Sequence, residues 1–281
     1  NNFVKKTKPQ IIFHLAAQPL VIDSFEKPHK TFDINLMGTL NILEVTKKYN
    51  FIKSVICVTS DKVYENVGKL KGYKESDTLG GTDPYSASKS SSEILIRSYR
   101  ESFFKKNNLC GISSVRAGNV IGGGDWSENR LLPDCIKSLM KKKKIVLRNP
   151  NFTRPWQFVL EPLKGYLILA KRQFTQPLKF SGAWNFGTQS NSSIKVIEIV
   201  KLIIKFWGNG QIKVLNTSRF KEQKNLQIDS SKAKKILNWK TSYTTKKAVS
   251  VTSEWYSKVF RDKLKPVDIT FQQINDYMKN P

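Results

Sequence analysis

A short apolar stretch at residues 54–58 (SVICV) is the feature that most constrains how this chain can fold. Its length and its β-branched side chains predict a buried strand. Further strands are predicted at residues 11–17 and 111–120, and helices at residues 24–50 and 85–105 lie between the three strands. Strands that alternate with helices along a chain form a parallel sheet covered by helices. The sequence therefore predicts an α/β fold.

Chemically reactive side chains directly follow the strand at residues 54–58. Ser60, Asp61 and Lys62 place a hydroxyl, a carboxylate and an amine in three consecutive residues. Tyr85 begins the next helix, and Lys89 lies one turn further along on the same face. An ammonium group beside a phenol lowers the pKa of that phenol, because the positive charge favours the phenolate. We therefore predict that Tyr85 can take up a proton and that it faces the polar triplet across the mouth of the sheet.

The charge of the chain is strongly basic, with 48 lysine and arginine residues against 22 acidic ones and a net charge of +26. Charge alone would suit a nucleic-acid partner. However, the lysines are scattered along the chain, and the one dense run, at residues 141–144, is expected at the end of a helix, where cations suit the helix dipole. No apolar run approaches the length of a membrane span. The basic charge therefore does not decide the class of protein. We expect a cytoplasmic protein with no nucleic-acid partner and no membrane association.

The cysteines and histidines exclude several kinds of site. Cys57, Cys110 and Cys135 are far apart, without metal-ligand or redox spacing, and we expect reduced, buried thiols. His14 and His29 are the two histidines of the chain, which is too few for most histidine-based triads or metal sites. We therefore predict no metal.

An ordered set of motifs resembles the extended short-chain dehydrogenase/reductases, and among them the 4,6-dehydratases that act on CDP-glucose. The resemblance runs from about Ile11 to Trp239. Its motifs are HLAAQPLV (14–21), NLMGTLNILE (35–44), VTSDKVYEN (58–66), GGTDPYSASK (80–89), RAGNVIGGGDW (116–126), RLLPD (130–134), LRNPNFTRPWQ (147–157) and GAWNFG (182–187). A Tyr-x-x-x-Lys pair alone is a weak signal, whereas the whole ordered set is specific.

The resemblance implies a reaction in three stages. Tyr85 would take the proton of the sugar 4-hydroxyl while a hydride passes to NAD, and Lys89 and Ser60 would bind the cofactor ribose and the 4-oxygen. Water would then leave from C5 and C6, with Asp61 protonating the departing hydroxyl and Lys62, as a neutral amine, removing the C5 proton. The hydride would finally return to C6. Related enzymes that act on dTDP-glucose carry Asp-Glu at this place, so Asp61-Lys62 favours CDP-glucose as substrate.

The resemblance also implies binding residues and an assembly. NAD would contact Leu15, Ala16, Ala17 and Thr59 in addition to Tyr85 and Lys89. The pyrophosphate and nucleotide of the substrate would contact Asn119, Arg130, Leu131 and Arg154, because arginine offers forked donors to phosphate. The resemblance further implies a homodimer and a role in deoxysugar biosynthesis, for example for lipopolysaccharide O-antigen. Two positions depart from the pattern: Ile22 replaces an expected arginine, and Phe158 an expected histidine.

These expectations define two domains. Residues 1–118 with 153–187 are predicted to form a partial NAD-binding Rossmann domain, and residues 119–152 with 188–281 a smaller mixed substrate domain. A dinucleotide-binding fold opens with a strand, a Gly-rich turn and a helix. No such turn precedes Ile11, so we expect a parallel sheet that is truncated at its amino-terminal side. The segment after the helix at residues 244–260 is expected to be a polar, peripheral tail.

Two alternative functions stay open at this point. One is a different NAD-dependent sugar-nucleotide enzyme, either a 4-epimerase or a dehydratase of the dTDP-glucose type. An epimerase eliminates no water and therefore needs no acid–base pair after Ser60. The other is an inactive fragment or a basic protein that binds nucleic acid, for which a strongly salt-dependent affinity for DNA or RNA would be diagnostic.

Overall fold

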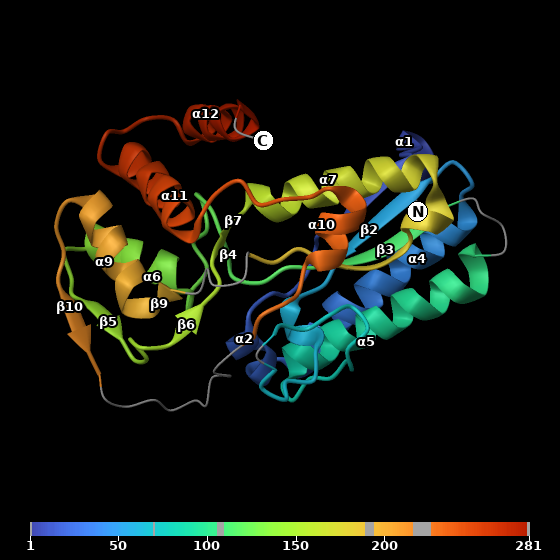
Figure 1. The fold of residues 1–281 in the computed structure, drawn as a ribbon, viewed down its shortest axis with the longest axis horizontal. Helices are drawn as coiled ribbons and strands as arrows, with labels where there is room; N and C mark the ends of the chain where they lie inside the picture. Colours follow the sequence, from blue (N-terminus) through green and yellow to red (C-terminus); the bar gives the residue numbers. More distant parts are fainter. Residues whose placement is uncertain (1, 70, 106–109, 189–193, 216–225, 280–281) are drawn as a thin grey trace. The chain divides into compact units, whose positions relative to one another are not determined.

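A computed structural model describes residues 2–69, 71–105, 110–188, 194–215 and 226–279, and its chain forms two compact units (Figure 1). Unit 1 contains Asn1–Gly118, Leu163–Gly187 and Leu226–Trp239, and unit 2 contains Asn119–Pro162, Thr188–Asn225 and Lys240–Pro281. Two segments therefore fall in a different unit from the predicted one, residues 153–162 and 226–239. The first is paired with residues 120–121 of unit 2, and the second is bonded to Tyr73 of unit 1.

A four-stranded parallel sheet forms the centre of unit 1. Its strands are β1 (Ile11–His14), β2 (Ser54–Val58), β3 (Gly111–Arg116) and β8 (Gly182–Asn185), in the order β1-β2-β3-β8. The prediction of an α/β fold with a parallel sheet is thereby confirmed. Since all four strands run in the same direction, their carboxyl ends lie at one edge of the sheet, where ligands of such folds bind.

Helices cover both faces of this sheet (Figure 1). Successive strand residues point to opposite faces. Val55 and Cys57 of β2 pack in one apolar cluster with residues of α4 (Gly38–Lys48) and α5 (Pro84–Tyr99). Ile56 packs in a second cluster with α7 (Leu160–Thr175), α8 (Pro177–Phe180) and α10 (Ser231–Leu237). Burial on both faces explains why this strand reads as an almost uninterrupted apolar run.

The predicted helix at residues 24–50 is interrupted in the structure. It divides into α2 (Val21–Glu26), α3 (Pro28–Phe32), a π-helical turn (Asp33–Met37) and α4. Pro28 begins α3, a position at which the missing N–H of proline is no loss. Gly38 begins α4, and a Cβ at this position would meet no atom within 4 Å, so this glycine does not mark close packing. A short helix, α1 (Asn2–Thr7), precedes β1.

In its described residues, unit 2 combines four helices with short strand pairs. Its helices are α6 (Leu131–Met140), α9 (Val196–Trp207), α11 (Thr245–Phe260) and α12 (Pro266–Lys279). β4 (Val120–Ile121) pairs in parallel with β7 (Gln157–Phe158), β5 (Ile145–Leu147) in parallel with β10 (Ile212–Val214), and β6 (Thr153–Arg154) antiparallel with β9 (Ile194–Lys195). The apolar faces of the helices pack together in one core.

The carboxyl-terminal segment is part of this core, and the prediction of a polar, peripheral tail is wrong. Ile269 and Tyr277 of α12 are buried. The Tyr277 hydroxyl donates to Glu161 Oε2 at 2.8 Å, and Trp255 Nε1 of α11 donates to Thr270 Oγ1 at 3.0 Å. A small number of apolar residues on one face is enough to pack a mostly polar helix when its neighbours supply the matching surface.

The three cysteines are free and buried, as expected. Cys57 lies in β2, Cys110 directly before β3, and Cys135 in α6. Burial raises the pKa of the Cys57 and Cys110 thiols to about 12. These thiols are therefore packing residues rather than nucleophiles. Within the described residues, no helix has both the length and the apolar character needed to cross a membrane.

Candidate active site

The triplet Ser60, Asp61 and Lys62 lies directly beyond the carboxyl end of β2. A single 3-10 turn, Asp61–Val63, holds it. Ser60 Oγ donates to Asp61 Oδ1 at 3.0 Å and accepts the Lys62 backbone N–H at 3.2 Å, so the serine caps the turn that follows it. The Asp61 backbone N–H donates to the Ala117 carbonyl at 3.3 Å. Ser60 and Asp61 are buried and Lys62 is half-buried, which leaves the amine the most accessible of the three side chains.

Gly118 provides the space for the Asp61 carboxylate. A Cβ at this position would lie 1.9 Å from Asp61 Oδ2, closer than any side chain permits. The sequence pattern did not single out Gly118, because its contact with Asp61 exists only after β2 and β3 are paired. Any larger residue at this position must displace the carboxylate or the strand end.

We expect Gly118→Ala to lower kcat by about tenfold or more, because small displacements of a reacting group are costly. Steady-state kinetics on CDP-glucose, the substrate that the family resemblance implies, would measure this effect. Thermal unfolding would show how much stability is lost. Gly38→Ala is the matched control, since a Cβ there meets no atom within 4 Å. It should leave kcat unchanged and leave stability equal or higher, because alanine favours a helix. Equal kinetics for both variants would show that Gly118 does not position Asp61.

Tyr85 and Lys89 lie on the first turns of α5. The Asp83 carboxylate accepts the Ser86 backbone N–H at 2.9 Å and thereby caps the amino end of the helix. The Tyr85 backbone N–H donates to Ser24 Oγ at 3.1 Å, and the Tyr85 side chain is 8% exposed. Lys89 is buried as well, and its Nζ donates to the Val58 carbonyl, the last of β2, at 3.1 Å. The structure therefore joins the helix of the Tyr-x-x-x-Lys pair to the strand that precedes Ser60.

The environment of Lys89 changes its protonation. Burial lowers its pKa from 10.5 to about 8, and the nearby Cys57 and Glu93 oppose this shift. His14, at the end of β1, has its pKa lowered by burial and by the charge of Lys89. Its Nε2 lies 3.3 Å from Thr39 Oγ1. Lys89 is thus within electrostatic reach of the carboxyl ends of both β1 and β2.

We expect Lys89→Met to be more stable than the native protein at about pH 7, by a difference that shrinks as the pH rises. The folded protein loses this proton near pH 8, whereas the unfolded chain keeps it up to about pH 10.5. The unfolded state therefore binds more protons in this window, and native stability relative to the variant rises through it. The effect at neutral pH is on the order of 3 kcal/mol, less about 1 kcal/mol for the lost hydrogen bond. Urea unfolding of both proteins at several pH values measures it, and a constant difference would contradict it.

The predicted cofactor contacts follow the same sheet edge. Leu15, Ala16 and Ala17 come directly after β1, and Leu15 is 50% exposed. Thr59 follows β2, and its hydroxyl donates to Glu93 Oε1 at 2.5 Å. Small, accessible residues after one strand and a buried cation close to the next suit a nucleotide cofactor at the sheet edge. Their role as NAD contacts stays a prediction.

The predicted substrate contacts all belong to unit 2. Asn119 has a left-handed backbone (φ 51°), which asparagine tolerates, and its carbonyl accepts the Gln157 N–H at 3.1 Å. Arg130 Nη1 pairs with Asp125 Oδ2 at 3.1 Å, and Leu131 begins α6. Arg154, in β6, donates to the Thr153 carbonyl at 3.0 Å. The roles of Asn119, Arg130, Leu131 and Arg154 toward a nucleotide stay predictions.

Phe158, where the family pattern implies a histidine, is a core residue of unit 2. Its side chain is 2% exposed. Its ring stacks on Tyr243 with the centroids 5.6 Å apart, and it is tilted against Tyr277 at 6.1 Å. An apolar side chain in this place supports packing and offers no polar group to a ligand. Among the described residues there is also no group of three or more His, Cys, Asp or Glu that could bind a metal ion.

The parallel sheet and its edge define the class of protein. A strand followed by Thr-Ser-Asp lies beside a helix whose first turns carry Tyr-x-x-x-Lys, and the lysine is bonded to the strand end. This combination is that of an extended short-chain dehydrogenase/reductase.

Comparisons with known proteins narrow the class. The family model described as GDP-mannose 4,6 dehydratase matches residues 1–252, so the chain belongs to that family. The CDP-glucose 4,6-dehydratase of Salmonella typhimurium is 39% identical over 282 residues, which cover 99% of this chain and 78% of that protein.

Two solved structures share the fold. The dTDP-glucose 4,6-dehydratase of Bacillus anthracis, in complex with NAD, has a TM-score of 0.75 at 24% identity over 92% of this chain and 76% of its own. The UDP-glucose 4-epimerase of Thermotoga maritima, with UDP-glucose, has a TM-score of 0.80 at 21% identity over 94% of this chain and 81% of its own. Since a dehydratase and an epimerase match about equally well, the fold alone does not distinguish their reactions.

Proposed function

We propose that this protein is a sugar-nucleotide 4,6-dehydratase that converts CDP-glucose to CDP-4-keto-6-deoxyglucose with NAD. The observation that carries the proposal is the turn Asp61–Val63, which presents a carboxylate and an amine next to Ser60. Loss of water requires one group that gives a proton and one that takes a proton. An epimerase has no use for this pair. The similarity to the CDP-glucose 4,6-dehydratase of Salmonella typhimurium, at 39% identity, supports the choice of substrate.

The redox half of the reaction uses the residues of α5. NAD, when bound, accepts the hydride from C4 and later returns it to C6. Tyr85 takes the proton from the 4-hydroxyl, and Ser60 Oγ donates a hydrogen bond to the same oxygen. Lys89 holds the ribose and favours the phenolate of Tyr85 through its positive charge. The small residues Ala16 and Ala17 allow the cofactor to approach the sheet edge.

The elimination half uses the triplet. The 4-ketone makes the C5 proton acidic, and Lys62 removes it. Asp61 gives a proton to the hydroxyl that leaves C6, and Lys62 returns a proton to C5 when the hydride adds to C6. The bond from Ser60 and the space beside Gly118 fix the orientation of the Asp61 carboxylate. Asn119, Arg130, Leu131 and Arg154 bind the nucleotide and its pyrophosphate, for which the two guanidinium groups offer forked donors.

An assay of the purified protein with NAD and CDP-glucose tests the proposal, with the product sugar identified by NMR. A methyl group at C6 together with a 4-ketone is the expected product. Unchanged glucose, or a C4 epimer without a methyl group, would reject the dehydratase. Parallel assays with dTDP-glucose, UDP-glucose and GDP-mannose test the nucleotide, and a higher kcat/KM with any of these would reject CDP-glucose. We also expect a homodimer, which light scattering on the purified protein would measure.

A further inference from the structure

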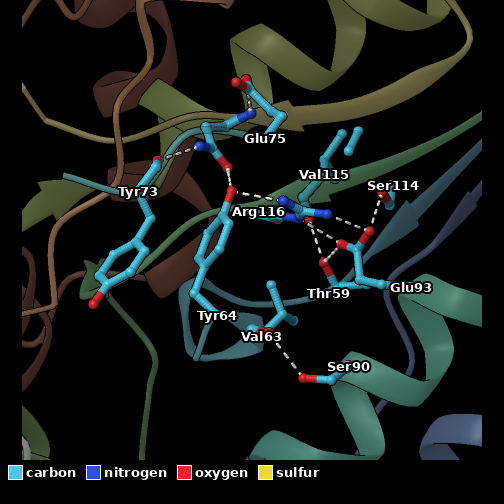
Figure 2. A network of polar contacts seen from close by, with 12 residues as sticks. Thr59, Val63, Tyr64, Tyr73, Glu75, Ser90, Glu93, Ser114, Val115 and Arg116 are labelled. Carbon is cyan, nitrogen blue, oxygen red and sulfur yellow. Dashed lines mark hydrogen bonds and ion pairs between the residues drawn. The ribbon is translucent and has the colours of Figure 1, made fainter. Parts of the chain in front are cut away.

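Glu93 is a buried carboxylate outside the set of residues that the proposed reaction uses. It lies on α5, one turn beyond Lys89, and is 4% exposed. It accepts two hydrogen bonds from Arg116, from Nε at 2.8 Å and from Nη2 at 2.7 Å. Ser114 Oγ donates to it at 2.6 Å and Thr59 Oγ1 at 2.5 Å (Figure 2). Burial alone would raise the pKa of Glu93, but Arg116 and the two hydroxyls lower it, so the group is a carboxylate.

The charged pair is itself fixed by a chain of hydrogen bonds. Arg116 Nη1 donates to the Tyr64 hydroxyl at 2.6 Å, and this hydroxyl donates to Asn185 Oδ1 at 2.8 Å. Asn185 Nδ2 donates in turn to the Tyr73 carbonyl at 2.8 Å. The network therefore spans α5, the ends of β2, β3 and β8, and the segment after the 3-10 turn (Figure 2). Satisfied networks of this kind are rigid.

The same helix contacts the chain on both sides of the catalytic triplet. Lys89 Nζ donates to the Val58 carbonyl at 3.1 Å, and Glu93 accepts the Thr59 hydroxyl. Beyond the triplet, Ser90 Oγ donates to the Val63 carbonyl at 2.9 Å (Figure 2). Residues 60–62 are thus bracketed by side chains from successive turns of α5. The contacts made by Lys89 and Glu93 both involve a charged group, and the one made by Glu93 reaches the residue next to Ser60.

We propose that Glu93 is a positioning residue, which fixes the elimination pair Asp61 and Lys62 relative to the redox pair Tyr85 and Lys89 by anchoring Thr59 to α5. The inference rests on the proposed function, because it concerns two halves of one reaction that share a substrate. Both pairs must reach neighbouring carbons of a single sugar ring. A misplacement of about 1 Å between such groups lowers the rate by about a hundredfold.

The test removes the link at Thr59 rather than the charge of Glu93. Substitution of Glu93 would leave the buried Arg116 guanidinium without its counter-charge, which is strongly destabilising. Thr59→Val keeps the shape of the side chain and the ion pair but removes the donor to Glu93. We expect kcat, measured at saturating NAD, to fall by about 10- to 100-fold, with KM for CDP-glucose within about twofold of native. Thr59→Ser restores the hydroxyl and should restore most of kcat.

Ser114→Ala is the matched control. It removes a hydrogen bond of similar length to the same carboxylate, from a residue that does not adjoin the triplet. It should lower stability by about as much as Thr59→Val and leave kcat unchanged. An equal loss of kcat in both variants, or near-native kcat in Thr59→Val, would overturn the proposal. So would a loss in Thr59→Val that saturating NAD abolishes, because Thr59 would then act through its predicted cofactor contact and not as the anchor of the triplet.

Hydrogen–deuterium exchange separates this inference from the proposed function. The Asp61 N–H is bonded to the Ala117 carbonyl and the Lys62 N–H to Ser60 Oγ, so exchange at these amides reports the order of the triplet without any substrate. Thr59→Val should accelerate exchange over residues 60–63 by about tenfold relative to Ser114→Ala. If native protein leaves CDP-glucose unchanged, the proposed function fails while this result can still stand. Equal exchange in the two variants overturns the positioning role.

Discussion

Tyr85→Phe should lower kcat by about 10²- to 10⁴-fold, the range expected when a general base is removed. Loss of the hydroxyl leaves nothing to take the proton from the sugar 4-hydroxyl. The oxidation at C4 therefore stops, and the later steps, which need the 4-ketone, cannot follow. The ring stays in its buried place, and its backbone bond to Ser24 is unaffected. Stability and binding of CDP-glucose should therefore change little. Steady-state kinetics, thermal unfolding and calorimetric titration with CDP-glucose measure the three quantities.

The control for this variant is Tyr99→Phe, at the other end of the same helix. The Tyr99 hydroxyl donates to Glu44 Oε1 at 2.6 Å, at the protein surface and away from the sheet edge. Its removal should leave kcat within about twofold of native, because an exposed hydrogen bond contributes little. A Tyr85→Phe enzyme with near-native kcat would exclude Tyr85 as the base and would require another group at C4.

The strands of unit 1 could be predicted from the sequence because each is a short apolar run between polar segments. The predicted strand at residues 54–58 coincides with β2 (Ser54–Val58). Its residues pack against helices on both faces, so nearly every position had to be apolar. The spacing of Tyr85 and Lys89 likewise required only that their helix include both residues, and α5 begins one residue before Tyr85, at Pro84. Local patterns were sufficient wherever a single element determined the outcome.

Features that depend on two distant segments could not be predicted in this way. Gly118 is essential for the place of the Asp61 carboxylate only because β3 runs beside β2. The position of Glu93, four residues after Lys89 on the same helix face, is apparent from the sequence. Its partner Arg116 is not, because it lies in β3, a separate element of the chain. The helix α12 was not predicted because its buried residues, Ile269 and Tyr277, stand in a mostly polar segment. The surface that buries them belongs to other parts of unit 2.

Asp61→Asn should stop the reaction at the 4-ketone and lower the rate of product formation by about 10²- to 10⁴-fold. An amide still accepts the hydrogen bond from Ser60 Oγ and fits beside Gly118, but it has no acidic proton to give to the departing hydroxyl. Oxidation at C4 does not involve this carboxylate and should proceed. The quenched reaction should therefore contain a 4-keto sugar that retains its C6 hydroxyl, which NMR identifies. Unaltered CDP-glucose would instead place Asp61 in the oxidation step.

Lys62→Met should stop at the same compound for a different reason, and solvent deuterium distinguishes the two variants. In Asp61→Asn the Lys62 amine can still remove the C5 proton and return a deuteron, so the 4-keto sugar should carry deuterium at C5. In Lys62→Met no base reaches C5, and the proton should persist. If the labels appear the other way round, the acid and the base are exchanged, with Asp61 removing the C5 proton. The contrast assigns the two roles individually, because both variants leave Tyr85 and Lys89 intact and differ only in which proton cannot move.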